Sequence, residues 1–201
     1  MNGAAALVYF RGAADLAYLN APGPTAEAPC LGPFKPLPCP RPVPDDHAIL
    51  QRTLAQIEAA FGDAPRPSND DLLHEQCIDD NDIVHLYPVT HWREMPDELV
   101  ESEYAALSFL SPGGFRHFIP AYMGFTLRHL ATGAAAVDST IWSLAPAVYA
   151  DPSVRDFVVS KLVSLTKSQR AAVLAFLDAI RELGDDYAAE QADKALRYWR
   201  P

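Results

Sequence analysis

Residues 104–130, YAALSFLSPGGFRHFIPAYMGFTLRHL, form the densest run of aromatic and aliphatic residues in the chain. After the break at 111–114, a set of mostly apolar side chains recurs at intervals of three and four residues, as on the core-facing side of an α-helix. These positions are Phe115, Phe118, Ile119, Tyr122, Thr126 and Leu130. The pattern predicts a central buried helix against which the other helices pack.

Helices are expected on both sides of this segment. On the N-terminal side, Asp45 or Asp46 is expected to cap a helix that ends at Gly62. Its expected buried line is Leu50, Leu54, Ile57 and Phe61. Pro96 is expected at the first position of a second helix, because proline is tolerated there and acidic residues follow it.

On the C-terminal side, the helix starts are marked by capping residues. Asp138 and Asp151 are expected to cap two helices, and Asp185 is expected to begin the last one. Thr166 and Gln169 match a capping box. No alternating run of β-branched residues occurs in the sequence. The predicted fold is therefore all-α, a compact multi-helix bundle of about six to seven helices.

The N-terminal part of the chain differs in composition from the rest. Nine of the eighteen prolines lie between Pro22 and Pro44, and proline-rich sequence is typical of an extended linker. We predict an N-terminal extension with a Pro-rich linker at 1–44 and a single all-α domain at 45–201. Residues 63–95 are rich in Pro, Asp and Asn, which predicts a long irregular acidic loop within that domain.

The negative charge of the chain is concentrated in one segment. The formal net charge is -10, and residues 63–103 contain twelve Asp and Glu against only Arg66 and Arg93. That segment alone therefore carries −10, and the remaining fourteen acidic and fourteen basic residues balance. Such a field disfavours nucleic acid phosphates and favours a basic protein partner, although a solvated acidic face that only maintains solubility fits equally well.

Other features of the sequence indicate where the protein resides. There is no apolar run of about 18 residues, so no membrane-spanning helix and no membrane partner are expected. The N-terminal apolar run is short and no basic residue precedes it, which disfavours a secretory signal. An odd set of three cysteines fits a reducing compartment. The expected localisation is cytoplasmic.

Four residues of the acidic loop have the chemistry of zinc ligands. These are His74, Cys77, His85 and His91, whose nitrogen and sulfur donors suit a tetrahedral site. The spacing matches no structural zinc pattern, so no cofactor is the first expectation and zinc is the alternative. In the same loop, Asp79, Asp80 and Asp82 are candidate binding residues that lack the glycine and glutamate of an EF-hand.

Three further residues are candidates for binding. Trp92 lies beside His91 and Arg93, and exposed aromatic residues next to arginine are frequent binding hot spots. Arg116 and His117 follow Gly113-Gly114, where free amides at a helix start would suit an anion. The alternative is that the glycines only turn the chain between two helices.

Several segments together resemble a family known as domain-of-unknown-function family 6714. They are LLHEQCIDDNDI, HW, EYAALSFLSPGGFRHFIPAYM, VDSTIWSL and LTKSQRAAVLAFL. The resemblance covers roughly Phe61 to Trp199. It implies a small bacterial soluble protein and brings no established activity and no catalytic residues.

Three functional hypotheses follow from the sequence. The first is a non-enzymatic interaction domain, of regulatory or inhibitor/immunity type, that binds a basic protein. The second is a metal-binding protein or enzyme that uses the loop 74–91, although no serine elbow, phosphate loop, dinucleotide fingerprint or H-E-x-x-H occurs. The third is a small-ligand-binding bundle with its pocket between the central helix and the loop. The first is preferred, and the oligomeric state stays open.

Overall fold

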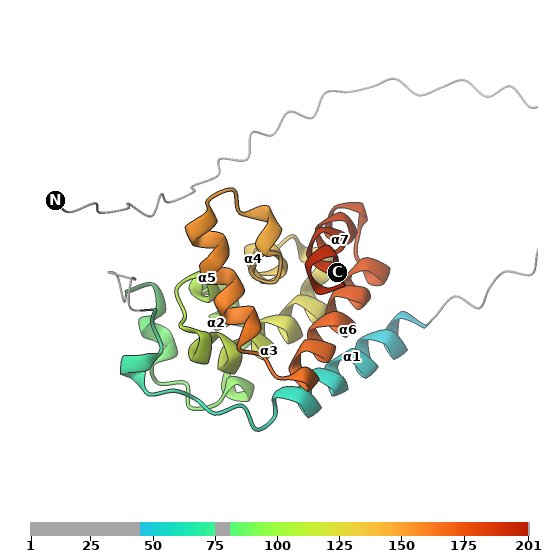
Figure 1. Ribbon diagram of the computed structural model, residues 1–201. Coiled ribbons are helices and arrows are strands. Elements are labelled where there is room, and N and C mark those ends of the chain that lie inside the picture. The colour runs from blue at the N-terminus through green and yellow to red at the C-terminus, as the bar shows by residue number, and fades with distance from the viewer. Residues whose placement is uncertain (1–44, 75–80, 201) are drawn as a thin grey trace, which may run out of the picture. The chain divides into compact units, whose positions relative to one another are not determined.

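The computed structural model describes residues 45–74 and 81–200 (Figure 1). The chain divides into two units, Met1–Arg41 and Pro42–Pro201, and every described residue belongs to the second. The extension and linker predicted at 1–44 lie outside the described residues. The described part contains seven α-helices and no strand longer than a single bridge, which confirms the all-α prediction. The helices are α1 (Asp46–Phe61), α2 (Asp97–Ser102), α3 (Pro112–His129), α4 (Ala135–Ser143), α5 (Pro152–Val163), α6 (Lys167–Leu183) and α7 (Asp186–Trp199).

Short 3-10 helices occupy parts of the connections. They are η1 (Asn69–Asp71), η2 (Asn81–Leu86), η3 (Trp92–Glu94), η4 (Ala106–Ser108), η5 (Leu130–Thr132) and η6 (Pro146–Val148). No helix of the described segments is long and apolar enough to cross a membrane.

The central helix of the bundle is α3, as the sequence predicts. It packs against α1, α2, α4, α5 and α6, and Figure 1 shows it running behind α6 and beneath α4 and α5. From Phe115 to Leu127 every residue except Arg116 is buried, including those that the periodic pattern would place outside. A helix surrounded by neighbours buries all its faces, so the expectation of a single core-facing side is corrected.

The first helix, α1, lies against both α3 and α6, and α7 packs on α6 (Figure 1). The buried residues of α1 are Ile49, Thr53, Ile57 and Phe61. The expected line through Leu50 and Leu54 was wrong, because both are only partly buried. Since α1 has neighbours on two sides, its buried face is centred between them, and Leu54 is left beside a groove described below.

Most predicted helix starts are confirmed by their caps. The side chain of Asp45 accepts a hydrogen bond from the amide of His47, and that of Asp151 accepts one from Ser153. Thr166 and Gln169 form the reciprocal capping box at the start of α6. These side chains satisfy amides that have no partner within their own helix.

Two predicted starts were wrong. Asp138 lies inside α4, whose N-cap is Ala134. The alanines before Asp138 are strong helix formers, so the helix begins earlier than the first polar residue. Pro96 is the N-cap of α2 rather than its first residue.

The segment predicted as an irregular loop contributes to the core. Besides its three 3-10 helices, it forms one antiparallel bridge between Leu73 and Leu110. The amide of Ser111 donates to the carbonyl of Leu72 over 2.7 Å, and His74 donates to Phe109 over 3.0 Å. Buried apolar residues, which include Leu72, Ile83, Leu86, Val89 and Trp92, attach the loop to the helices.

Candidate functional site

The three described histidines of the proposed zinc set lie in different surroundings. The ring of His74 packs against Phe157, with centroids 4.1 Å apart. Nδ1 of His85 lies 2.6 Å from a carboxylate oxygen of Glu103. His91 accepts a hydrogen bond from the amide of Arg93 at its Nδ1 atom. Among the described residues, no three His, Cys, Asp or Glu side chains are grouped so that they could hold a metal ion.

The remaining loop candidates cannot be placed. Cys77, Asp79 and Asp80 lie outside the described residues, and only the backbone of Asp82 is described. The zinc and aspartate-loop hypotheses therefore stay predictions.

Trp92 is a buried anchor instead of an exposed aromatic residue. Its exposed fraction is 9%, and its indole N–H donates to the carbonyl of Phe61 over 3.1 Å. The guanidinium of Arg93 lies over the ring, 5.1 Å from its centroid. The hydrogen bond to Phe61, together with that from Nη1 of Arg93 to the carbonyl of Gly62, attaches the end of α1 to η3.

His117 is buried beneath the same region. It is 1% exposed, and its Nδ1 atom lies 3.0 Å from the carbonyl of Ala64. Its Nε2 atom makes no hydrogen bond with any described residue. Burial lowers the pKa of His117, with a smaller contribution from His91, whose ring centroid is 5.7 Å away. A neutral imidazole that donates from Nδ1 to Ala64 fits this environment.

The turn before α3 is packed against the loop. The amide of Gly114 donates to Oγ of Ser111, which caps the helix. A Cβ atom at Gly114 would lie 2.8 Å from the carbonyl oxygen of Leu72. Gly114 thus lets the loop approach the helix start closely, which is a structural reason for glycine at this position. Nε of Arg116 is buried and makes no hydrogen bond with the described residues.

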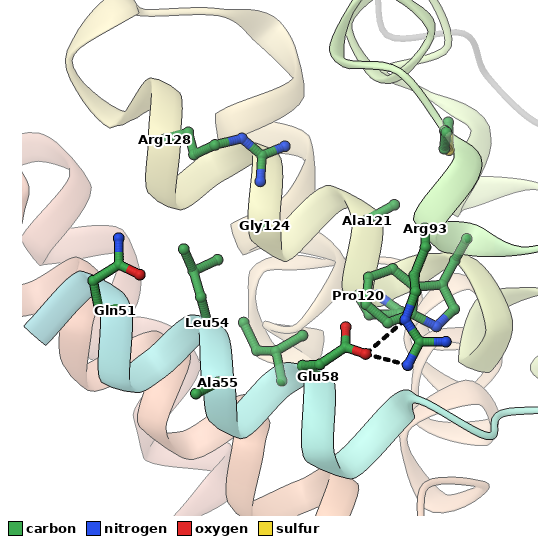
Figure 2. Close-up of a pocket in the computed structure, with 12 residues that line it drawn as sticks. Gln51, Leu54, Ala55, Glu58, Arg93, Pro120, Ala121, Gly124 and Arg128 are labelled. Atoms are coloured by element: carbon green, nitrogen blue, oxygen red, sulfur yellow. Dashed lines mark hydrogen bonds and ion pairs between the residues drawn. The ribbon is translucent and has the colours of Figure 1, made fainter.

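A groove lies between α1, α3 and the segment 92–95, as Figure 2 shows. We call it the α1–α3 groove, and its volume is about 400 Å³. The third hypothesis places a pocket in this region, between the central helix and the loop. The lining residues are Gln51, Leu54, Ala55, Ile57, Glu58, Trp92, Arg93, Met95, Pro120, Ala121, Gly124 and Arg128.

Two ion pairs border this groove. Arg93 donates to the carboxylate of Glu58, with Nε 2.6 Å from Oε1, as the dashed lines in Figure 2 show. Hydrogen bonding to Glu58 raises the pKa of Arg93. At the other end, Arg128 donates to both oxygens of Asp97. Nε2 of His129 also lies 2.7 Å from Oδ2 of Asp97. Arg128 above all, and also His129, holds the pKa of Asp97 below its ordinary value of 3.8.

The Asp97 contacts predict an acid dependence of stability. A carboxylate with a depressed folded-state pKa stabilises the fold above its unfolded pKa and loses this contribution as the pH falls through the folded pKa. When the pH is lowered from about 5 to about 2, the free energy of unfolding should fall in the wild type. It should fall less in the Asp97→Asn variant, which has no carboxylate to protonate at this position. Urea denaturation at a series of pH values measures this difference.

The matched control is Asp156→Asn, which removes an exposed carboxylate on α5 that forms no ion pair with a described residue. This variant should follow the wild-type curve. If Asp97→Asn follows it too, the contact with Arg128 does not stabilise the fold.

The structure also shows a buried lysine that was not expected from the sequence. Lys161 is 1% exposed, and its Nζ donates to the carbonyl of Leu107 over 2.8 Å. The ammonium lies over the rings of Phe157 and Phe115, 4.3 and 5.3 Å from their centroids. The only signal in the sequence is the position of Lys161 on the apolar side of α5, where a charged residue would not be expected.

The described residues thus define an all-α domain with a buried central helix and an open groove beside it. A family model described as a family of unknown function, DUF6714, matches residues 50–201, and the chain belongs to this family. The resemblance noted from Phe61 to Trp199 is confirmed, and the match begins earlier, within α1. No curated protein and no solved structure gives a significant match to the chain.

Proposed function

We propose that this domain is a non-enzymatic interaction module, of regulatory or inhibitor type, that binds a basic protein partner. The observation that carries the proposal is a set of exposed aromatic side chains beside carboxylates. We call this set the aromatic–acidic surface. It consists of Tyr104, Trp142, Tyr187, Asp138 and Asp185. The three aromatic residues are 47%, 40% and 48% exposed.

The elements that carry this surface are neighbours. The hydroxyl of Ser139 in α4 donates to the carbonyl of Tyr104 over 2.5 Å, which joins α4 to the segment after α2. Asp138 and Trp142 are four residues apart in α4, so they lie on one side of that helix. On its other flank, α4 packs against α7, which carries Tyr187.

The carboxylates give the surface a negative potential. Burial raises the pKa of Asp138, and the negative charge of Asp185 raises it further. The pKa of the Tyr187 hydroxyl is also raised, first by burial and then by the negative charge of Asp138, while Lys194 lowers it. A cation from a partner would relieve the repulsion between the two carboxylates.

Basic side chains of a protein fit this chemistry best. Arginine and lysine bind over aromatic faces and pair with carboxylates, whereas nucleic acid phosphates are repelled by a chain of net charge -10. Glu98 and Glu101 of α2, the helix that precedes Tyr104 in the chain, are both exposed and add negative charge. We propose that the protein is bacterial and acts in the cytoplasm. There it would cover a basic surface of its partner.

Affinity capture tests the proposal, with the purified full chain as bait and a bacterial lysate as the source of partners. We expect wild-type protein to retain basic proteins at about 50 mM salt and to release them at about 500 mM, because the shorter Debye length screens the charges. The double variant Asp138→Lys, Tyr187→Ala should lose them.

The control is Asp156→Lys, which makes the same charge change on α5, and it should retain the wild-type partners. Capture that ignores salt, shows no excess of basic proteins, or survives in the double variant would contradict the proposal.

A further inference from the structure

We propose that the α1–α3 groove binds a small amphipathic carboxylate, whose acid group pairs with Arg128 and whose apolar part lies along the groove. This site shares no residue with the aromatic–acidic surface, so the two proposals stand or fall separately. The volume of about 400 Å³ lies within the range that is typical of small-molecule sites.

The first argument is the unused donor capacity of Arg128. A guanidinium has five N–H groups, and in Arg128 Nε and Nη2 each donate to Asp97. Its Nη1 atom donates to no described residue, and it lies 3.2 Å from the position that a Cβ atom would take at Gly124. Since Gly124 lines the groove, the two free N–H groups of Nη1 lie over its floor.

A second polar group lies at the same end. Gln51 on α1 is exposed and forms no side-chain hydrogen bond with a described residue. In Figure 2, Gln51 and Arg128 come from facing helices at the end of the groove opposite Glu58 and Arg93. Gln51 therefore offers a second N–H donor at the Arg128 end of the groove.

Between the polar end at Arg128 and the Glu58–Arg93 pair at the other end, the groove has an apolar stretch. The buried side chains of Ile57, Met95 and Ala121 line it, and the ring of Pro120 is also buried there. Glycine and alanine on α3 keep the walls apart, so a chain or ring of a ligand has room between the helices. This stretch would shield the apolar part of a ligand from water.

The groove is not acidic, although the whole chain has a net charge of -10. Its two arginines are each paired with a carboxylate, Arg93 with Glu58 and Arg128 with Asp97, so the local charges balance. What favours an anion is therefore the unused N–H groups of Arg128. The carboxylate of Glu58 is held by Arg93 at the far end, which reduces its repulsion of a bound anion. Carboxylate is preferred over a neutral acceptor because a hydrogen bond to a charged oxygen is shorter and stronger.

The test uses the full chain and octanoate as the probe, with octanamide as its uncharged analogue. We expect isothermal titration calorimetry to show saturable binding of octanoate and at least about tenfold weaker binding of octanamide, since a charged hydrogen bond is lost. Arg128→Gln should weaken octanoate by a similar factor and leave octanamide unchanged.

A second pair of variants tests the place of binding without altering any charge. Ala55→Phe fills the groove from an exposed position on α1 and should abolish octanoate binding. Ala59→Phe, one turn later on the same helix and outside the lining, should bind like the wild type. No saturable binding of octanoate, equal binding of octanamide, or undiminished binding in Ala55→Phe would each overturn the proposal.

Discussion

Replacing Phe118 by alanine should lower the free energy of unfolding by about 3–5 kcal/mol, the largest single effect that we expect in this domain. Phe118 is 0% exposed and lies in the part of α3 that is buried on all sides. Its ring meets that of His117 edge-on, with centroids 4.8 Å apart. Because neighbouring helices surround α3, they cannot collapse into the cavity without moving the centre of the bundle.

Urea denaturation followed by circular dichroism measures this loss. Val163→Ala is the matched control, because Val163 is 55% exposed and its truncation should change stability by less than about 0.5 kcal/mol. A loss in Phe118→Ala no larger than in the control would contradict the central position of α3.

Gly114→Ala is expected to destabilise the domain by about 1–3 kcal/mol, because its added methyl group overpacks the start of α3. A Cβ atom there would lie 2.8 Å from the carbonyl oxygen of Leu72 and 3.1 Å from Cδ2 of Leu110. The backbone of Leu72 accepts the hydrogen bond from Ser111, so it cannot retreat without breaking the attachment of the loop.

The neighbouring Gly113 provides a close control for this prediction. At Gly113 a Cβ atom would meet Pro67 at 3.6 Å and Oγ of Ser111 at 3.8 Å, both ordinary contact distances. Gly113→Ala should therefore be neutral or slightly stabilising, since alanine is the better helix former. Equal unfolding free energies for the two alanine variants would show that the loop does not pack tightly on the helix start.

The helices could be predicted from sequence wherever their ends carry a local signal. Thr166 with Gln169 and Asp151 with Pro152 are short-range patterns whose hydrogen bonds form within one turn, so the capping residues alone indicate them. The rotation of α1 about its own axis, which decides which of its side chains are buried, was predicted less accurately. Leu50 and Leu54 have the correct spacing for a buried line, but only the positions of α3 and α6 determine that Ile49 and Thr53 are buried instead.

The candidate sites were harder to predict for a related reason. The α1–α3 groove joins Gln51, Met95 and Arg128, which are far apart in the chain and have no shared motif. The third hypothesis from the sequence named this general region, because it expected a pocket between the central helix and the loop. Asp138 and Tyr187 were missed because the negative charge of 63–103 dominates the composition, whereas their pairing depends on the packing of α4 against α7.

The packing of α1 against α6 has a consequence for the synthesis of the protein. Phe61, the last residue of α1, and Lys167, the first of α6, are 106 residues apart in sequence. On the ribosome, α3 is available to α1 earlier, but the side of α1 that packs on α6 stays uncovered until most of the domain has been translated. Such distant pairing slows folding, because the entropy of closing the intervening chain is lost before the contacts form. Chaperones that hold exposed apolar helices would act on this nascent chain at the stage before α6 leaves the exit tunnel.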